Sequence, residues 1–324
     1  MIQSFVTACK MQRQHEDREA PFVKRIVCIL MALLLAGWII SCKEVETGEE
    51  SPARLKVVTS IYVLYDFTLK IGGDHVSVTN LLPPGAEPHE WEPGTNDLLC
   101  LEQADVFIYN GAGMEHWLDK VVASLENKDL ILVETTKGLP LRHLGDSEQT
   151  LQYDPHVWLN PLFAMHQMEL ISNALASADP EHQNEYNQAY QSYADDLIAL
   201  DQAYRESLST LSHRDLIVTH AAFGYLADAY GLNQISIEGI SPDSEPDPAR
   251  MAEIVDYAKE HDVQVIFYVE FSSPKVAETV AREIGARTAA LHPLGGLTDE
   301  QLAAGEDYFS IMRKNLSTLV DALS

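Results

Sequence analysis

The order of strand-forming and helix-forming segments constrains the fold most strongly, because these segments alternate in two separate runs. The first run has candidate strands at 55–60, 76–82, 106–109 and 130–133, with candidate helices at 65–71, 96–103 and 115–125. The second run has candidate strands at 215–219, 233–237 and 265–269, with candidate helices at 223–230, 248–261, 274–284 and 303–323. Such alternation is typical of parallel βα units. Each run therefore predicts one α/β lobe.

The stretch between the two runs predicts their connection. Residues 161–211 are rich in Ala, Gln and Leu, lack Gly, and contain Pro180 as the internal helix breaker. They predict one helix to about Ala178 and a second from Pro180 to about Leu211, with Pro in its first turn. At 1.5 Å per residue the second helix spans roughly 45 Å. A coiled coil is disfavoured, because the apolar positions keep no seven-residue repeat.

These segments together predict the fold class and the domain organisation. We expect an α/β protein in which a long rigid helix at 180–212 joins two parallel-sheet lobes, at 55–179 and 213–324. Ligands of open parallel sheets bind beyond the carboxyl ends of the strands. A site in the cleft between the lobes is therefore expected.

An apolar segment near the N-terminus predicts the cellular location. Lys24 and Arg25 precede the apolar run from Ile26 to Ile40, which Ser41 and Cys42 follow. A basic segment before about fifteen apolar residues is typical of a signal peptide rather than a membrane span. A small residue directly before Cys resembles a lipobox, whose Cys becomes diacylated. The competing interpretation is an uncleaved anchor with a chance Cys.

We therefore predict a lipoprotein signal peptide at 1–41, then the lipidated Cys42 and a polar flexible tether at 42–54. The protein is expected on the outer face of the cytoplasmic membrane, attached through its lipid. The polar stretch before the apolar run is longer than usual, so Met11 or a later residue competes with Met1 as the start.

Composition argues against nucleic-acid binding and against cysteine-based sites. The chain has 49 acidic and 22 basic residues, which argues against nucleic-acid binding because that requires clustered Lys and Arg. Cys9 and Cys28 lie in the predicted leader and Cys42 carries lipid, so Cys100 is the one cysteine left in the body. A disulfide or a Cys-based zinc site within the body is therefore excluded. Any metal site must use His and carboxylates.

Four histidines follow or end strand segments, in loops rich in Pro or small residues. They are His89, His156, His220 and His292. Side chains at such positions converge in α/β folds, and neutral imidazole favours tetrahedral Zn²⁺, whereas oxygen ligands favour Mn²⁺, Ca²⁺ or Mg²⁺. On spacing alone, unrelated loop histidines remain the competing interpretation.

Four motifs occur in one order along the chain. They are 81–93 (Leu-Leu-Pro-Pro-Gly-Ala-Glu-Pro-His-Glu-Trp-Glu-Pro), 154–161 (Asp-Pro-His-Val-Trp-Leu-Asn-Pro), 218–225 (Val-Thr-His-Ala-Ala-Phe-Gly-Tyr) and 305–316 (Gly-Glu-Asp-Tyr-Phe-Ser-Ile-Met-Arg-Lys-Asn-Leu). Together with the lipobox they resemble the zinc/manganese solute-binding lipoproteins of ABC importers, the TroA-like family. The resemblance runs from about Lys56 to the C-terminus.

The resemblance implies a ligand set. His89, His156 and His220 match the family's first three metal ligands, and His at the third position, where manganese-selective members have Glu, favours Zn(II) over Mn(II). The family's fourth ligand is an acidic residue after the last strand, but 291–296 contains none. The resemblance therefore leaves His292 or water as the fourth ligand. Glu270, which also follows a strand, is interpreted as supporting the ligands or the fold.

The implied function is capture of Zn(II) as cargo without chemistry. The expected partners are an ABC importer permease and its cytoplasmic ATPase, and the receptor is expected to be a monomer that is not an enzyme. An exported zinc hydrolase is disfavoured, because His89-Glu90 lacks the second His of a His-Glu-x-x-His motif. An Mn(II) receptor of the same type and a lipid-anchored adhesin with the same fold are the remaining candidate functions.

Overall fold

The computed structural model describes residues 54–144, 151–240, 247–270 and 272–324. The predicted signal peptide, the lipidation site Cys42 and the tether up to residue 53 lie outside these ranges. Within them, we find no helix with both the length and the hydrophobicity needed to cross a membrane.

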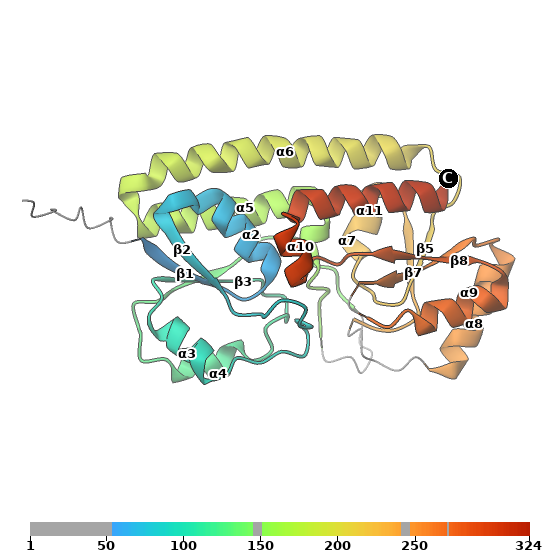
Figure 1. Cartoon of the computed structure of the whole chain (residues 1–324), viewed down its shortest axis with the longest axis horizontal. Helices are drawn as coiled ribbons and strands as arrows, with labels where there is room; N and C mark the ends of the chain where they lie inside the picture. The colour runs from blue at the N-terminus through green and yellow to red at the C-terminus, as the bar shows by residue number, and fades with distance from the viewer. Residues whose placement is uncertain (1–53, 145–150, 241–246, 271) are drawn as a thin grey trace, which may run out of the picture. The chain divides into compact units, whose positions relative to one another are not determined.

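The first run of segments forms a four-stranded parallel sheet in the order β2-β1-β3-β4 (Figure 1). Its strands are β1 (Leu55–Thr59), β2 (Val76–Asn80), β3 (Val106–Tyr109) and β4 (Ile131–Glu134). Its helices are α2 (Tyr62–Gly72), α3 (Thr95–Glu102) and α4 (Leu118–Ser124). Val57 of β1 lies opposite Val78 on one side and Val106 on the other. Such β-branched residues favour strands.

The second run forms another four-stranded parallel sheet, in the equivalent order β6-β5-β7-β8. Its strands are β5 (Asp215–Val218), β6 (Asn233–Ser236), β7 (Val265–Val269) and β8 (Arg287–Leu291). Its helices are α7 (Gly224–Tyr230), α8 (Pro248–Glu260) and α9 (Lys275–Ile284). The candidate strands named from the sequence do not include β8, because Ala289 and Ala290 have low strand propensity, although the position given to His292 requires a strand before it. Pairing with β7 along its whole length stabilises β8.

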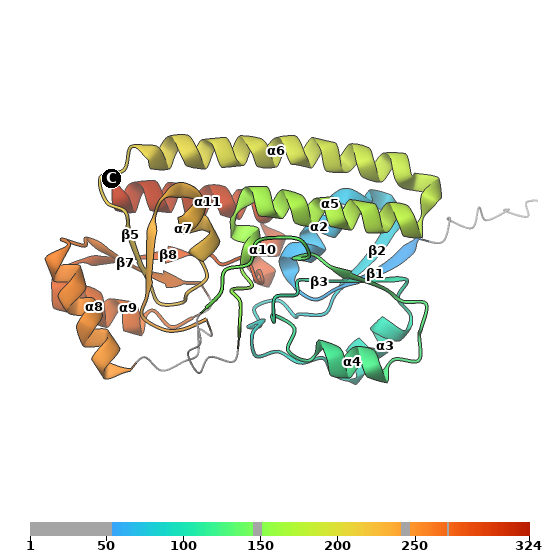
Figure 2. The ribbon, with the colours of Figure 1, turned by 180° about the vertical axis from the view of Figure 1, so that it is seen from behind.

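Three long helices cover one side of both sheets. They are α5 (Pro161–Ala178), α6 (Gln183–Ser209) and α11 (Tyr308–Leu323). In Figures 1 and 2, α6 runs along both lobes, and α5 and α11 lie between it and the sheets. The Asn160 side chain caps α5 by accepting the Leu162 N–H at 2.9 Å. Two parallel-sheet α/β lobes with a long helix between them confirm the predicted fold class.

The predicted C-terminal helix at 303–323 begins later than expected, at Tyr308 of α11, and Ala303 is instead the last residue of a separate short helix, α10 (Asp299–Ala303). Gly305 has a φ of 75°, which is the left-handed region that glycine adopts readily. Asp307 then caps α11, since its Oδ1 accepts the Ser310 N–H at 2.8 Å. The helix therefore restarts after a break that the helical pattern alone does not reveal.

One continuous core connects the two lobes. Its buried residues come from both sheets and from α2, α5, α6 and α11. The hydroxyl of Tyr308 donates to the Trp158 carbonyl at 2.7 Å, and that of Tyr204 donates to the Met312 carbonyl at 2.7 Å. A wide hinge motion between the two lobes would expose this shared apolar surface to water. We therefore expect any opening of the cleft between the lobes to be small and local.

Candidate metal centre

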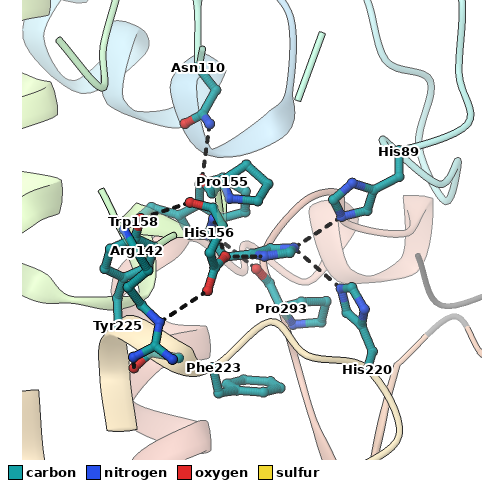
Figure 3. Close-up of polar contacts among 12 residues, drawn as sticks. His89, Asn110, Arg142, Pro155, His156, Trp158, His220, Phe223, Tyr225 and Pro293 are labelled. Atoms are coloured by element: carbon teal, nitrogen blue, oxygen red, sulfur yellow. Dashed lines mark hydrogen bonds and ion pairs between the residues drawn. The ribbon is translucent and has the colours of Figure 1, made fainter. Parts of the chain in front are cut away.

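Three of the predicted histidines converge between the lobes (Figure 3). His89 lies in the loop after β2, His156 lies in the loop between β4 and α5, and His220 follows β5. The Nε2 atom of His156 lies 3.1 Å from that of His89 and 3.3 Å from that of His220. Zn–N bonds of 2.0–2.1 Å in tetrahedral geometry place neighbouring nitrogens about 3.3 Å apart. The spacing therefore suits one tetrahedral ion.

Burial disfavours the charged form of two of the three histidines. Burial lowers the pKa of His89 to about 3, with repulsion from His156 and His116 as the next causes. Burial likewise holds the pKa of His220 well below its usual value, and repulsion from His156 and His89 adds to the effect. Neutral rings can turn nitrogen lone pairs toward one another only at an electrostatic cost, which a cation between them relieves.

Asp154 fixes the orientation of His156. Its Oδ1 accepts the ring Nδ1–H of His156 at 2.9 Å and the backbone N–H of the same residue at 3.0 Å. A proton on Nδ1 leaves the Nε2 lone pair available for a metal. Asp154 belongs to the second sequence motif, but the motif alone does not indicate this role. A carboxylate two residues before a loop His is the signal that could have revealed it.

Arg142 connects this loop to α7. Its Nε lies 3.7 Å from Asp154 Oδ2, and its guanidinium forms an ion pair with Asp228. The backbone of α7 comes close here, because a Cβ added at Gly224 would lie 2.6 Å from Arg142 Nε and 2.8 Å from Asp154 Oδ2. Glycine at 224 therefore leaves room for the Arg142–Asp154 contact beside the site.

The histidines line a cavity of about 70 Å³. Its wall also contains Trp158, Glu270 and Gly295. The Trp158 ring packs beside His156, with its Nε1–H donating to the Pro293 carbonyl at 2.7 Å. Because the N-terminal lobe supplies two of the histidines and the C-terminal lobe supplies the third, the cavity lies where both lobes contribute side chains.

The chain is similar to known proteins over most of its length. The family model "ZnuA: Zinc-uptake complex component A periplasmic" matches residues 57–322. The chain belongs to the ZnuA family. This confirms the resemblance to metal-specific solute-binding lipoproteins, and places the chain among solute-binding receptors rather than in a family of enzymes.

Two curated ZnuA-family relatives match most of the chain. The high-affinity zinc uptake system protein ZnuA of Bacillus subtilis is 39% identical over 280 residues, which cover 83% of this chain and 88% of the relative. The zinc-binding lipoprotein AdcA of Streptococcus pneumoniae is 35% identical over 303 residues, which cover 90% of this chain. The matched part is only 60% of the AdcA length.

Solved ZnuA-like structures share the fold. The Zn(II)-bound ZnuA-like domain of S. pneumoniae AdcA has a TM-score of 0.74 and 37% identity, covering 83% of this chain and 99% of that domain. The laminin binding protein Lmb of Streptococcus agalactiae, described as a bifunctional protein with adhesin and metal transporting activity, has a TM-score of 0.76 and 31% identity. That match covers 83% of this chain and all of Lmb.

The fourth predicted histidine, His292, does not join the other three. Among the described residues, the group whose ligating atoms lie within 4.8 Å of one another comprises His89, His156 and His220, without His292. His292 is buried, and its Nδ1 accepts the Leu294 N–H at 2.9 Å. A neutral ring that accepts at Nδ1 carries its proton on Nε2, which lies 3.6 Å from Glu270 Oε2. That tautomer offers Nε2 no lone pair for a metal.

Asn110 supports the loop that carries His156. Its Nδ2 donates to the Pro155 carbonyl at 3.0 Å (Figure 3), and its Oδ1 accepts from Gln167 Nε2 at 3.1 Å. Asn110 is itself held by the buried carboxylate of Glu115, which accepts its backbone N–H at 2.9 Å. This chain of buried hydrogen bonds preorganises the loop. No sequence pattern indicates it, because Pro155 and Gln167 are distant from Asn110 along the chain.

Proposed function

We propose that this ZnuA-family chain is an extracytoplasmic receptor that binds Zn(II) through His89, His156 and His220 and delivers it to an ABC importer. The observation that carries the proposal is the spacing of the three Nε2 atoms, at 3.1 and 3.3 Å from the central His156. These separations suit three ligands of one tetrahedral ion.

Zinc is the proposed cargo because the three converging donors are neutral nitrogens. Imidazole suits Zn(II), whereas Mn(II) favours carboxylate, carbonyl and water oxygens. The B. subtilis and S. pneumoniae relatives are both named for zinc, which supports the same choice. An Mn(II) receptor of the same type is the competing outcome.

The proposed partners follow from the family. We infer an ABC permease with a cytoplasmic ATPase, attachment of the receptor to the membrane through lipid on Cys42, and action as a monomer on the outer face of the cytoplasmic membrane. The words "lipoprotein" and "uptake system" in the relatives' names support this assignment. The receptor is proposed to lack catalytic activity.

Adhesion is a second candidate function. The observation that favours it is the likeness to the laminin-binding Lmb structure. An adhesin of this kind would bind immobilised laminin in a saturable way, and a receptor limited to metal capture would not. An exported zinc hydrolase would instead show zinc-dependent turnover of ester or peptide substrates.

The proposal is tested by titrating the full-length chain with Zn(II) and Mn(II) in competition with a chromophoric chelator. We expect one Zn(II) per chain, and a loss of affinity of at least about 100-fold in His220→Ala, since losing outer contacts alone costs 10–100-fold. His261→Ala, which alters an exposed histidine on the same lobe, is the control and should bind as the parent does. Unchanged affinity in His220→Ala would refute the site.

A further inference from the structure

We propose that Glu270 is the fourth ligand of the bound zinc, so that the C-terminal lobe contributes an anionic oxygen beside His220. This inference rests on the proposed three-histidine zinc site. It differs from the sequence interpretation, in which Glu270 only supports the ligands and His292 or water takes the fourth place.

Glu270 and His220 lie at the same edge of the C-terminal sheet. Glu270 directly follows β7, and β7 pairs with β5, the strand that His220 follows. Parallel neighbouring strands end at the same edge of a sheet, so the two side chains emerge together. Glu270 lines the same cavity as the three histidines.

The other carboxylate in the cavity wall has a different task. Glu87 also lines the cavity, but its Oε1 accepts the backbone N–H of His89 at 3.1 Å and so supports the loop that carries the first histidine. Across the cavity, Gly295 has no side chain, and a Cβ there would lie 2.9 Å from Pro88 Cγ. Pro88 and Gly295 therefore fill that part of the wall without offering a ligand.

One hydrogen bond orients the Glu270 carboxylate through one of its oxygens. Glu270 Oε2 accepts from Gln301 Nε2 at 2.8 Å, and the amide of Gln301 is itself fixed because its Oε1 accepts the Thr298 N–H at 2.9 Å in the capping box of α10. Among the described residues, the hydrogen bond and the ion-pair contact of the Glu270 carboxylate both involve Oε2. The second oxygen, Oε1, is thus offered for ligation.

The charge and the mobility of Glu270 also suit a ligand. Three neutral imidazoles contribute no negative charge to the coordination of Zn²⁺ in a partly buried cavity, and a carboxylate ligand would reduce the charge of the ion directly. Glu270 lies outside the 4.8 Å group, so ligation requires its side chain to rotate toward the ion. The side chain is 41% exposed, so it has room to change rotamer, and the rotation exchanges its hydrogen bond from Gln301 for the ion. Ligation would then tie the C-terminal lobe to the ion at two points.

The test compares Zn(II) affinity of the full-length chain with that of Glu270→Gln, which keeps the shape and the hydrogen-bonding capacity of the side chain. Glu278→Gln, on α9 of the same lobe, removes the same charge from an exposed position and serves as the control. We expect Glu270→Gln to weaken binding by at least about 10-fold and Glu278→Gln to have no such effect. Thermal melts without metal should be the same for both variants.

A crystal structure of the zinc-loaded parent would identify the fourth ligand independently of the affinity measurements. We expect a Zn–Oε distance to Glu270 of about 2.0–2.2 Å. A water molecule or His292 in the fourth position would overturn the inference, as would equal affinities of Glu270→Gln and the parent. If His220→Ala also bound zinc as the parent does, the proposed function itself would fail. If Glu270→Gln binds zinc as the parent does but His220→Ala does not, only the assignment of Glu270 as the fourth ligand is overturned.

Discussion

Asp154 Oδ1 accepts two hydrogen bonds from His156, one from the ring Nδ1–H and one from the backbone N–H. The same ring turns its Nε2 toward His89 and His220. One carboxylate oxygen therefore selects both the rotamer and the tautomer of the central histidine. The two histidines on either side can then meet a common ion.

The first prediction concerns this carboxylate. Asp154→Asn should weaken Zn(II) binding by about 10–100-fold, because the amide no longer favours a proton on Nδ1 of His156. Chelator competition measures the effect. Asp228→Asn is the control, since it removes the exposed partner of Arg142 without touching His156, and it should change affinity little. Equal effects of the two substitutions would contradict the role given to Asp154.

The second prediction concerns the close approach of α7. Gly224→Ala should destabilise the metal-free protein by about 1–3 kcal/mol, because the new Cβ would overlap with Arg142 and Asp154. Urea denaturation measures the loss, and zinc affinity should fall with it as the Asp154–His156 pair shifts. An unchanged unfolding midpoint together with parental zinc affinity would contradict the close approach of residue 224 to Arg142 and Asp154.

The third prediction concerns the link between the C-terminal helix and the loop that carries His156. Tyr308→Phe leaves the buried Trp158 carbonyl without the hydroxyl that donates to it, so we expect a loss of about 1–3 kcal/mol in the free energy of unfolding. Tyr193→Phe is the control, because Tyr193 is half-buried and its hydroxyl makes no hydrogen bond within the described part of the chain. A comparable loss in the control would argue against a specific hydrogen bond.

The fourth prediction concerns pH. Burial lowers the pKa of His89 to about 3, whereas an unfolded His titrates near 6.5. Between these values the unfolded chain binds more protons than the folded one, so the stability of the metal-free protein should fall as pH drops from about 6.5 toward 3. Urea midpoints at several pH values measure this. His89→Gln should show a shallower pH dependence, and an unaltered slope would contradict the assignment.

Sequence patterns predict the sheets better than the elements beside them. Val57, Val106 and Ile217 are buried and lie in short runs rich in β-branched residues. Such runs indicate a buried strand from the sequence alone. The pattern does not reveal β8, because Ala289 and Ala290 form a strand only through pairing with β7. Nor does it reveal the break before α11, which depends on the backbone at Gly305 and the cap at Asp307 rather than on hydrophobic periodicity.

The site is predictable to the same extent. His89, His156 and His220 are predicted together from their positions after strands and from the motifs around them, and the structure brings the three together. His292 and Glu270 both follow strands of the C-terminal lobe, so sequence position alone does not distinguish them. Which side chain lines the cavity depends on partners such as Leu294 and Gln301, and only the fold reveals those contacts.

A zinc-edge anomalous difference map from crystals of the zinc-loaded chain would locate the ion without assumptions about its ligands. We expect one strong peak per chain, within about 2.0–2.1 Å of Nε2 of His89, His156 and His220. A zinc ion bound away from these three nitrogens, or bound by only one of them, would contradict the three-histidine site.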